Sequence, residues 1–371
     1  MDDIIQLIRS SQDENWDTIA ESARKITHAS VETKPSAYLS GELDIFSVKT
    51  SSKPGEAHQY GHTSNLHHNA GESERRVSEV MQPGSWTNVT QDGELVQHLV
   101  QVYLAWGAPL YTFFSEVLFM HGMEDRKMKY CTPLLVNAVL ALGCHFSDRP
   151  EARANPTDPS STGDHFYAEA ERLFRADSRP CLTTVQALGI MSLHQAMNNR
   201  DSSGWSLMCQ TMGMVIELGL HIEAPPNGKI TPSEAVARRI TFWGAYFLQT
   251  AWAICVGRIT LLPRTAIRMD KPAVLDHLEM KPWKPHGHFS YTGTPSTLEQ
   301  PGFRLTLMLH TINLCELIDD IVQVFYAPRD RVTSRRLLAY YEKLQNWYLS
   351  LPESLAIKQG SPTLPQVMCL Q

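Results

Sequence analysis

The sequence predicts an all-α fold in which a single large multi-helix domain follows a disordered N-terminal arm. Apolar residues recur every three or four positions throughout the chain after Glu94, as in amphipathic helices. Capping residues and first-turn prolines mark several helix starts. No stretch alternates apolar and polar residues as a strand does. Hydrophobic residues make up 43% of the 371 positions, enough for a sizeable core.

The N-terminal part divides into two predicted segments. Residues 1–25 carry Ile4, Trp16 and Ile19 at near-helical spacing, which predicts a short helical segment. Residues 26–92 are rich in serine, histidine, glycine and threonine and show no sustained period. This composition buries too little apolar surface to offset the entropy of ordering, so we predict a disordered linker.

The main predicted domain spans residues 93–356 and opens with a helix whose apolar stripe includes Leu95 and Trp106. Thr132-Pro133 predicts the next helix start, because the hydroxyl caps a free amide and proline suits the first helical position. Residues 134–142 are apolar on nearly every side. They predict a central, fully buried helix.

Further signals divide the middle of this domain. A surface loop rich in aspartate, proline and serine is predicted over residues 149–162, and an amphipathic helix follows from Gly163. Thr183 and Gln186 have the spacing of a capping box at another helix start. After a short polar turn, the following helix is predicted over residues 205–220.

Thr231-Pro232 predicts the start of a long aromatic helix that runs through Ile254. Residues 259–302 contain several prolines and glycines, which favour irregular structure. Two further helices are predicted over residues 303–326 and 334–349. Residues 357–371 then form a segment that we interpret as incomplete.

Charge and cysteine usage narrow the function classes. The formal net charge is −6 and the sequence pI is about 6.2, so the chain lacks the basic face of a free-standing DNA binder. The arginine pairs Arg238-Arg239 and Arg335-Arg336 are interpreted as solvated or ion-paired surface. The seven cysteines are dispersed along the chain, so we predict that they are reduced residues of the core. No secretory signal occurs at Met1, and no apolar run approaches the roughly 20 residues that span a membrane.

No catalytic motif is recognisable, and we expect neither a catalytic residue nor a cofactor site in this chain. Phosphate-binding glycine loops and a serine nucleophile elbow are absent from the sequence. Asp319-Asp320 suggests a magnesium-dependent enzyme acting on prenyl diphosphates, but the aspartate expected one turn later is missing. A solvated acidic patch is the alternative interpretation.

The histidines allow a weak metal hypothesis. Four of them, His58, His62, His67 and His68, have spacings found between zinc ligands, but they lie in the predicted linker without partner cysteines. Histidines beside apolar helices, including His145 and His194, are interpreted as hydrogen-bonded structural imidazoles. We therefore predict no metal site.

Several segments, taken in order, resemble the regulatory middle domain of fungal zinc binuclear cluster transcription factors, the group that includes the xylanolytic and nitrate-assimilation activators. The resemblance extends over about residues 94–355. The matching segments are residues 140–147, 163–170, 181–190, 204–205, 216–221, 238–244, 257–258, 347–348 and 351–352.

The resemblance implies a nuclear regulator of RNA polymerase II transcription. In the family, a separate N-terminal module with six paired cysteines holds zinc and contacts DNA. For the helical domain, the resemblance implies contacts with other transcription factors or corepressors and binding of a small-molecule effector. It implies no membrane partner.

The resemblance also implies candidate site residues near a central cavity. The aromatic helix and the position after it offer a possible effector pocket lined by Trp205, Trp243, Tyr246, Phe247 and Arg258. Core packing of the aromatic side chains is the alternative. For Arg258 the alternative to anion binding is contact with the carbonyls at the end of the helix.

The sequence departs from the family pattern at three places. No cysteine precedes Cys131, so the zinc module is absent and DNA binding depends on a part that this chain lacks. Gln249 occupies a neighbourhood where the family often has an aspartate. The chain stops at Gln371, where the family continues into another long helix, which predicts a domain truncated at its C-terminal end.

Two functional alternatives remain beside the regulatory domain. A chain without the zinc module is also expected for a partner-binding or dominant-negative regulator, or for a fragment from an incomplete gene. The all-helical prenyl-diphosphate enzyme is the third hypothesis, and it rests on Asp319-Asp320 and the aromatic residues.

Overall fold

The computed structural model describes residues 49–50, 59–60, 85–223, 230–274, 279–286, 300–326, 331–357 and 363–371. The helix predicted for residues 1–25 lies outside these residues, and so does most of the predicted linker. Residues 85–92 are described, and they contact the helical domain. Thr87 is buried and donates a hydrogen bond to Asn137 Oδ1 over 2.7 Å.

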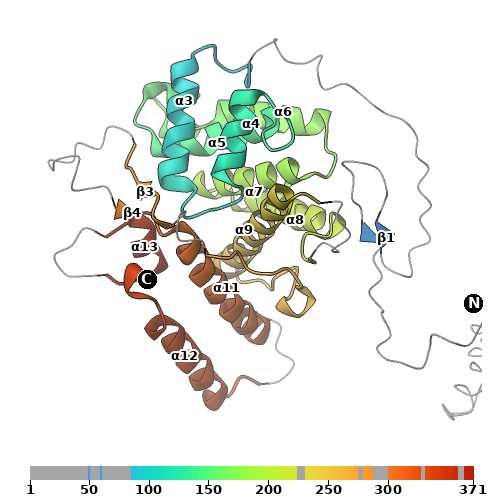
Figure 1. The fold of residues 1–371 in the computed structure, drawn as a ribbon, viewed down its shortest axis with the longest axis vertical. Helices are drawn as coiled ribbons and strands as arrows, with labels where there is room; N and C mark the ends of the chain where they lie inside the picture. Colours follow the sequence, from blue (N-terminus) through green and yellow to red (C-terminus); the bar gives the residue numbers. More distant parts are fainter. Residues whose placement is uncertain are drawn as a thin grey trace, which may run out of the picture. The chain divides into compact units, whose positions relative to one another are not determined.

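The described residues are mostly helical, which confirms the all-α prediction (Figure 1). The α-helices are α3 (Gly93–Val102), α4 (Glu116–Asp125), α5 (Pro133–Gly143), α6 (Asp164–Ala176), α7 (Leu182–Met197), α8 (Asp201–Glu217), α9 (Pro232–Val256), α11 (Arg304–Tyr326), α12 (Ser334–Leu349) and α13 (Pro365–Leu370). A π-helix, η2 (Tyr103–Gly107), continues α3. The 3-10 turns are η3 (Cys144–Phe146), η4 (Pro150–Ala152), η5 (Pro159–Ser161), η6 (Arg264–Ala266) and η8 (Glu353–Leu355).

Strand structure is minimal in the described residues. Two antiparallel pairs occur, β1 (Lys49–Thr50) with β2 (Gln59–Tyr60) and β3 (Pro282–Trp283) with β4 (Gln300–Pro301). The pair β3–β4 brings Trp283 against the π-helix, where its indole Nε1 donates to Ala105 O over 2.8 Å.

Helix α5 is the centre of the domain. All eleven of its residues are buried, as the sequence predicts. Thr132 caps the helix by accepting a hydrogen bond from Leu135 N, and Pro133 occupies the first turn. Around α5 lie α3, α6 and α7, and α7 contacts α8 and α9 in turn. The core is therefore continuous from α3 to α9.

Helix α9 follows its predicted boundaries. Thr231 accepts a hydrogen bond from Glu234 N at the start, and Gly257 ends the helix in the left-handed conformation at φ 65°. The Glu234 carboxylate does not complete a capping box with Thr231. It instead pairs with Lys129 Nζ at 2.9 Å.

Two local predictions were wrong or incomplete. The capping box at Thr183 and Gln186 does not form, because α7 begins at Leu182 after Cys181 and lacks a side-chain cap. Gln186 is buried and donates to Thr241 Oγ1 on α9 over 2.8 Å. Helix α4 was not predicted, and its start is capped by Ser115.

The C-terminal part has a small core of its own. Leu307 of α11 lies in a buried cluster with Leu355, Leu364 and Val367, apart from the main core. Helix α12 contacts α11 but buries none of its residues. Trp347 Nε1 donates to His310 O over 3.1 Å and is one of the polar contacts between the two helices.

The cysteines are all described and all free, but the prediction that they are core residues holds only in part. Cys131, Cys144 and Cys315 are buried, whereas Cys255 and Cys369 are exposed. Among the described helices, none is both long and apolar enough to span a bilayer.

Candidate functional site

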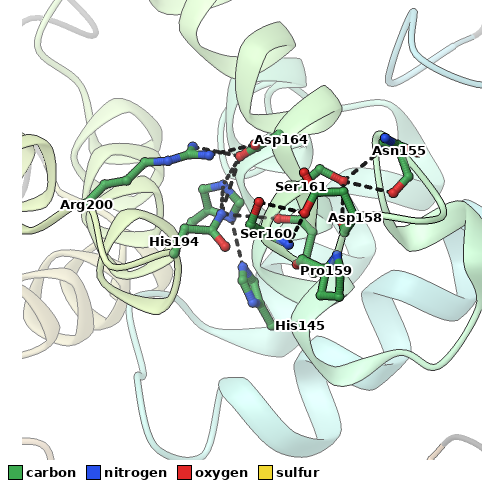
Figure 2. A network of polar contacts seen from close by, with 11 residues as sticks. His145, Asn155, Asp158, Pro159, Ser160, Ser161, Asp164, His194 and Arg200 are labelled. Carbon is green, nitrogen blue, oxygen red and sulfur yellow. Dashed lines mark hydrogen bonds and ion pairs between the residues drawn. The ribbon is translucent and has the colours of Figure 1, made fainter.

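A polar network joins the ends of three helical segments near the surface of the domain (Figure 2). The carboxylate of Asp164 accepts two hydrogen bonds from Arg200, Nη1 at 2.8 Å and Nη2 at 2.7 Å. His194 Nε2 lies 3.4 Å from Asp164 Oδ1, and His194 Nδ1 lies 3.1 Å from His145 Nε2. The network thus runs from the exposed Arg200 to the buried imidazole of His194 and the half-buried imidazole of His145.

Local structure places each of these side chains. Asp164 is the first residue of α6, where the positive end of the helix dipole favours a carboxylate. Gly163, just before it, has φ 73°, and a Cβ at this position would collide with Ala141 O. His194 lies in the last turn of α7, and His145 in the turn η3 after α5. Asp164 therefore reaches His194 only because Gly163 allows close approach to α5.

Burial decides the electrostatics of the two imidazoles. Desolvation lowers the pKa of His194 from 6.5 to about 4, although the nearby Asp164 opposes this effect. Desolvation, and secondly the neighbouring His194, lower the pKa of His145 to about 4. Both imidazoles are therefore neutral at physiological pH. Arg200 holds the pKa of Asp164 below its usual value against the opposing effect of partial burial.

The network is built for positioning. Tyr167 of α6 stacks on His194 with ring centroids 5.0 Å apart and an interplanar angle of 17°. Asn198 Nδ2 donates to Thr162 O over 3.3 Å, which ties the end of α7 to the preceding loop. Asn198 Nδ2 also donates to Asp164 Oδ1 over 3.3 Å, so this carboxylate holds the start of α6 against the end of α7. His145 and His194 are hydrogen-bonded to each other, and their structural role remains an interpretation.

The predicted pocket residues fall into separate groups. Trp243 and Tyr246 are buried in the main core with their rings edge to face, at a centroid distance of 5.5 Å. Trp243 Nε1 donates to Asp270 O over 2.8 Å. Phe247 is half-buried, and its ring centroid lies 5.8 Å from that of Tyr111.

Trp205 and Arg258 form a group of their own. The guanidinium of Arg258 lies over the ring of Trp205, 4.7 Å from its centroid, an arrangement that gives a cation–π attraction. The exposed Arg258 extends from the end of α9 toward α8. A shared effector pocket for the five predicted residues remains a prediction.

Asp319, weighed above as a metal ligand, is a buried structural carboxylate. It accepts hydrogen bonds from Arg264 N at 2.9 Å, from Tyr246 Oη at 3.3 Å and from Thr260 Oγ1. Asp320 is partly exposed and lies 3.8 Å from Arg264 Nε. These bonds join α9, α11 and the segment that follows α9, and they leave no pair of carboxylates free for magnesium.

Gln249 has a comparable structural role. Its buried side chain brackets the backbone of Leu262, donating to Leu262 O over 2.9 Å and accepting from Leu262 N over 3.1 Å. An uncharged glutamine therefore stands in this neighbourhood, and it both donates to and accepts from the backbone of Leu262. In the part of the chain that the structure describes, no group of three or more possible ligands is arranged for a metal ion. His58, His62, His67 and His68 lie outside that part.

These observations describe a helical domain in which the buried side chains of His194, Asp319 and Gln249 bond neighbouring segments to one another. The chain matches the family described as the fungal specific transcription factor domain over residues 100–349. It belongs to this family.

Curated relatives agree with the family. The chain is 33% identical over 303 residues to the nitrogen assimilation transcription factor nit-4 of Neurospora crassa, an alignment covering 77% of this chain and 27% of the relative. It is 33% identical over 298 residues to the nitrogen assimilation transcription factor nirA of Emericella nidulans, covering 77% and 33%. This chain therefore spans a third or less of these relatives. No solved structure matches it.

Proposed function

We propose that the chain is the regulatory domain of a nuclear transcription factor that controls RNA polymerase II transcription. The observation that carries this proposal is the family match over residues 100–349. The two relatives at 33% identity are both nitrogen assimilation transcription factors. DNA contact in the whole protein then belongs to a zinc-cluster module outside this chain, and zinc is the cofactor of that module alone.

The described surface supports a role in contacts with proteins. Helix α12 exposes Leu337, Leu338, Tyr341 and Tyr348 on one face. Most monomeric surfaces scatter such residues singly, so a contiguous apolar face marks an interaction site. Other transcription factors or corepressors are the partners that we propose, together with a small-molecule effector.

A domain exchange tests the proposal. Residues 93–356 replace the matching region of the Neurospora relative, and a nitrogen-assimilation reporter is measured in a strain that lacks the native factor. We expect reporter activity that depends on the nitrogen source. A hybrid that is expressed at the normal level and leaves the reporter unresponsive would contradict the proposal.

A DNA-binding measurement on the isolated chain provides an independent check. We expect negligible affinity for duplex DNA at physiological salt, because the net charge is −6 and phosphate binding requires a basic face. Tight, sequence-selective retention in a gel-shift experiment would contradict this part of the proposal.

A second function, titration of a partner, also draws support from the exposed face of α12. Co-expression of this chain with the full-length relative distinguishes the two functions. A dominant-negative chain lowers the reporter in proportion to its own level, and substitution of Leu337 and Tyr341 by serine relieves that effect.

A further inference from the structure

Helix α12 differs from the other helices in the side chains that it exposes. Five of its large hydrophobic side chains are exposed, whereas no other helix that the structure describes carries more than two. They are between 51% and 78% exposed, and they are Leu337, Leu338, Tyr341, Tyr348 and Leu349. We call these five residues the α12 face. An exposed apolar cluster of this kind on a protein surface marks a binding site.

The α12 face lies outside the contact between α12 and its neighbour α11 (Figure 1). The partly buried residues of α12 are Tyr340, Leu344 and Trp347, which recur every three or four positions and therefore share one side of the helix. That side meets α11, where Trp347 Nε1 donates to His310 O over 3.1 Å. The α12 face is thus open to a partner while the other side of the helix is held.

The shape of the α12 face suits a second helix. Residues 337–349 rise about 18 Å along the helix axis, which is the length of roughly three turns. Backbone groups inside α12 are bonded within the helix, so it offers a partner no strand edge to pair with. A partner segment buried here must satisfy its own backbone groups, and an α-helix does so.

Arginine side chains gather at the N-terminal end of the α12 face. Arg331, Arg335 and Arg336 are exposed, and none of them forms an ion pair with a residue that the structure describes. The positive end of the helix dipole adds to their charge. Further along the helix, Lys343 offsets Glu342, the one carboxylate of α12. The segment is therefore positive, although the formal net charge of the chain is −6.

These charges disfavour two other occupants of the α12 face. A second copy of this chain would bring an equally positive helix onto the face, and like charges repel. An anionic membrane would attract the arginines but would repel the rest of the chain, which is more acidic than the whole. Carboxylates on a single partner helix meet the arginines without either penalty.

We propose that the α12 face binds an amphipathic helix of a partner protein, with acidic side chains of that helix beside Arg335 and Arg336. Its apolar side chains lie against Leu338 and Tyr341. Tyrosine and arginine are residues that commonly dominate the energy of protein interfaces. The proposal deepens the partner contacts given under the proposed function and rests on them.

Two synthetic peptides of about 18 residues test the proposal, since much shorter peptides are marginal helices in water. Both carry leucine at every third or fourth position and alanine elsewhere, and flanking positions hold glutamate in one peptide and glutamine in the other. Binding of each labelled peptide to the full chain is measured by fluorescence anisotropy. We expect the glutamine peptide to bind about threefold to tenfold more weakly, because it lacks the ion pairs. Equal affinities, or no binding of the glutamate peptide at about 1 mM chain, would overturn the proposal.

Two double variants locate the contact on α12. Leu337→Ser with Tyr341→Ser should lower the affinity for the glutamate peptide at least about tenfold, because apolar contacts are lost. Arg335→Glu with Arg336→Glu should remove or reverse the preference for glutamate over glutamine. Val117→Ser, which is 49% exposed on α4, is the control and should leave binding unchanged. Binding that neither double variant alters would place the peptide elsewhere and overturn the proposal.

Salt provides a test on the unaltered chain. Raising the ionic strength from about 0.1 M to about 1 M shortens the range of charge interactions from roughly 10 Å to 3 Å. The affinity for the glutamate peptide should fall toward that for the glutamine peptide, whose affinity should not fall. The same response of both peptides would contradict the role given to the arginines.

Other occupants of the α12 face give results of their own. Sedimentation of the parent chain as a dimer, and of the serine double variant as a monomer, would assign the face to a second copy. Retention on phosphatidylserine vesicles that is lost in the same variant would assign it to a membrane surface. Either result, without binding of the glutamate peptide, rejects the proposal.

The reporter exchange described above separates this inference from the proposed function. A hybrid that responds to the nitrogen source, combined with absence of glutamate-peptide binding, rejects the acidic helix and leaves the regulatory role in place. A hybrid without any response, combined with peptide binding that the serine double variant abolishes, rejects the proposed function and keeps the docking face.

Discussion

Helices α5 and α12 have the same kind of N-terminal cap but differ completely in burial. Thr132 caps α5 and Thr333 caps α12, in both cases by accepting a backbone N–H three residues further on. Every residue of α5 is buried, whereas α12 has no buried residue. A cap therefore fixes where a helix starts, and the surrounding side chains decide how firmly it is held. We infer that the main body is a stable scaffold and that the C-terminal part is the adjustable one.

The largest loss of stability is expected when a large buried side chain of the main body is truncated. Trp243→Ala removes a fully buried indole together with its hydrogen bond to Asp270 O. We expect a loss of about 3–5 kcal/mol in the free energy of unfolding, measured by urea titration. Tyr348→Ala on α12 is the matched control and should cost far less, because Tyr348 is exposed. Similar losses for both variants would refute the comparison.

The second prediction concerns the hydrogen bonds of Asp319, which join α9 and α11. Asp319→Asn keeps the shape of the side chain but removes the charge that Arg264 N and Tyr246 Oη donate to. Hydrogen bonds to charged groups are worth about 1.5–3 kcal/mol, so we expect a loss of roughly 2 kcal/mol. Faster hydrogen exchange should appear first in α11 and α12. Asp320→Asn is the control, because its partly exposed carboxylate lies 3.8 Å from its cation.

Acidification should lower the free energy of unfolding of the main body, because His145 and His194 are held neutral in the folded chain. His145 and His194 both have a pKa of about 4 in the folded chain, below the unfolded value of 6.5. Between these values the unfolded chain binds more protons, so stability is complete above pH 6.5 and falls as the pH drops toward 4. We expect a loss on the order of several kcal/mol across this window.

Urea titrations at a series of pH values, on the parent chain and on His194→Gln, measure this effect. The variant should show a shallower dependence on pH in the same window, whatever its stability at pH 7.5. A parent chain with equal stability at pH 7 and pH 4.5 would contradict the account of the network.

The smallest effect is expected on the exposed face of α12. Leu349 is 78% exposed, so Leu349→Ala should change the free energy of unfolding by less than about 0.5 kcal/mol. The same substitution at Leu140, which is fully buried in α5, should cost about 2–5 kcal/mol. Thermal unfolding of the two variants side by side measures the contrast.

Local capping signals were the most reliable part of the sequence prediction. Thr132 and Thr231 act within their own first turns, so no distant partner was needed to recognise them. The capping box at Thr183 failed for the opposite reason. Gln186 has a tertiary partner, Thr241, which lies 55 positions away and takes the side chain from the expected cap.

The functional site depended on contacts that spacing does not reveal. His145 and His194 are 49 residues apart, and from the sequence each could be interpreted only by itself, as a structural imidazole. The aromatic residues after Thr231 were recognised as important, but the sequence did not show that Phe247 faces Tyr111 while Trp243 enters the core. Gly163 marked only the start of a helix in the sequence, whereas in the structure its missing Cβ permits a close approach that larger residues would block.

Native-state hydrogen exchange of the full chain, read by mass spectrometry, tests the uneven stability of the domain most directly. The account predicts that amides of α5 and α7 exchange only through global unfolding, while amides of α12 exchange many times faster through local opening. Protection of α12 equal to that of α5 would contradict the division into a stable body and an adjustable C-terminal part.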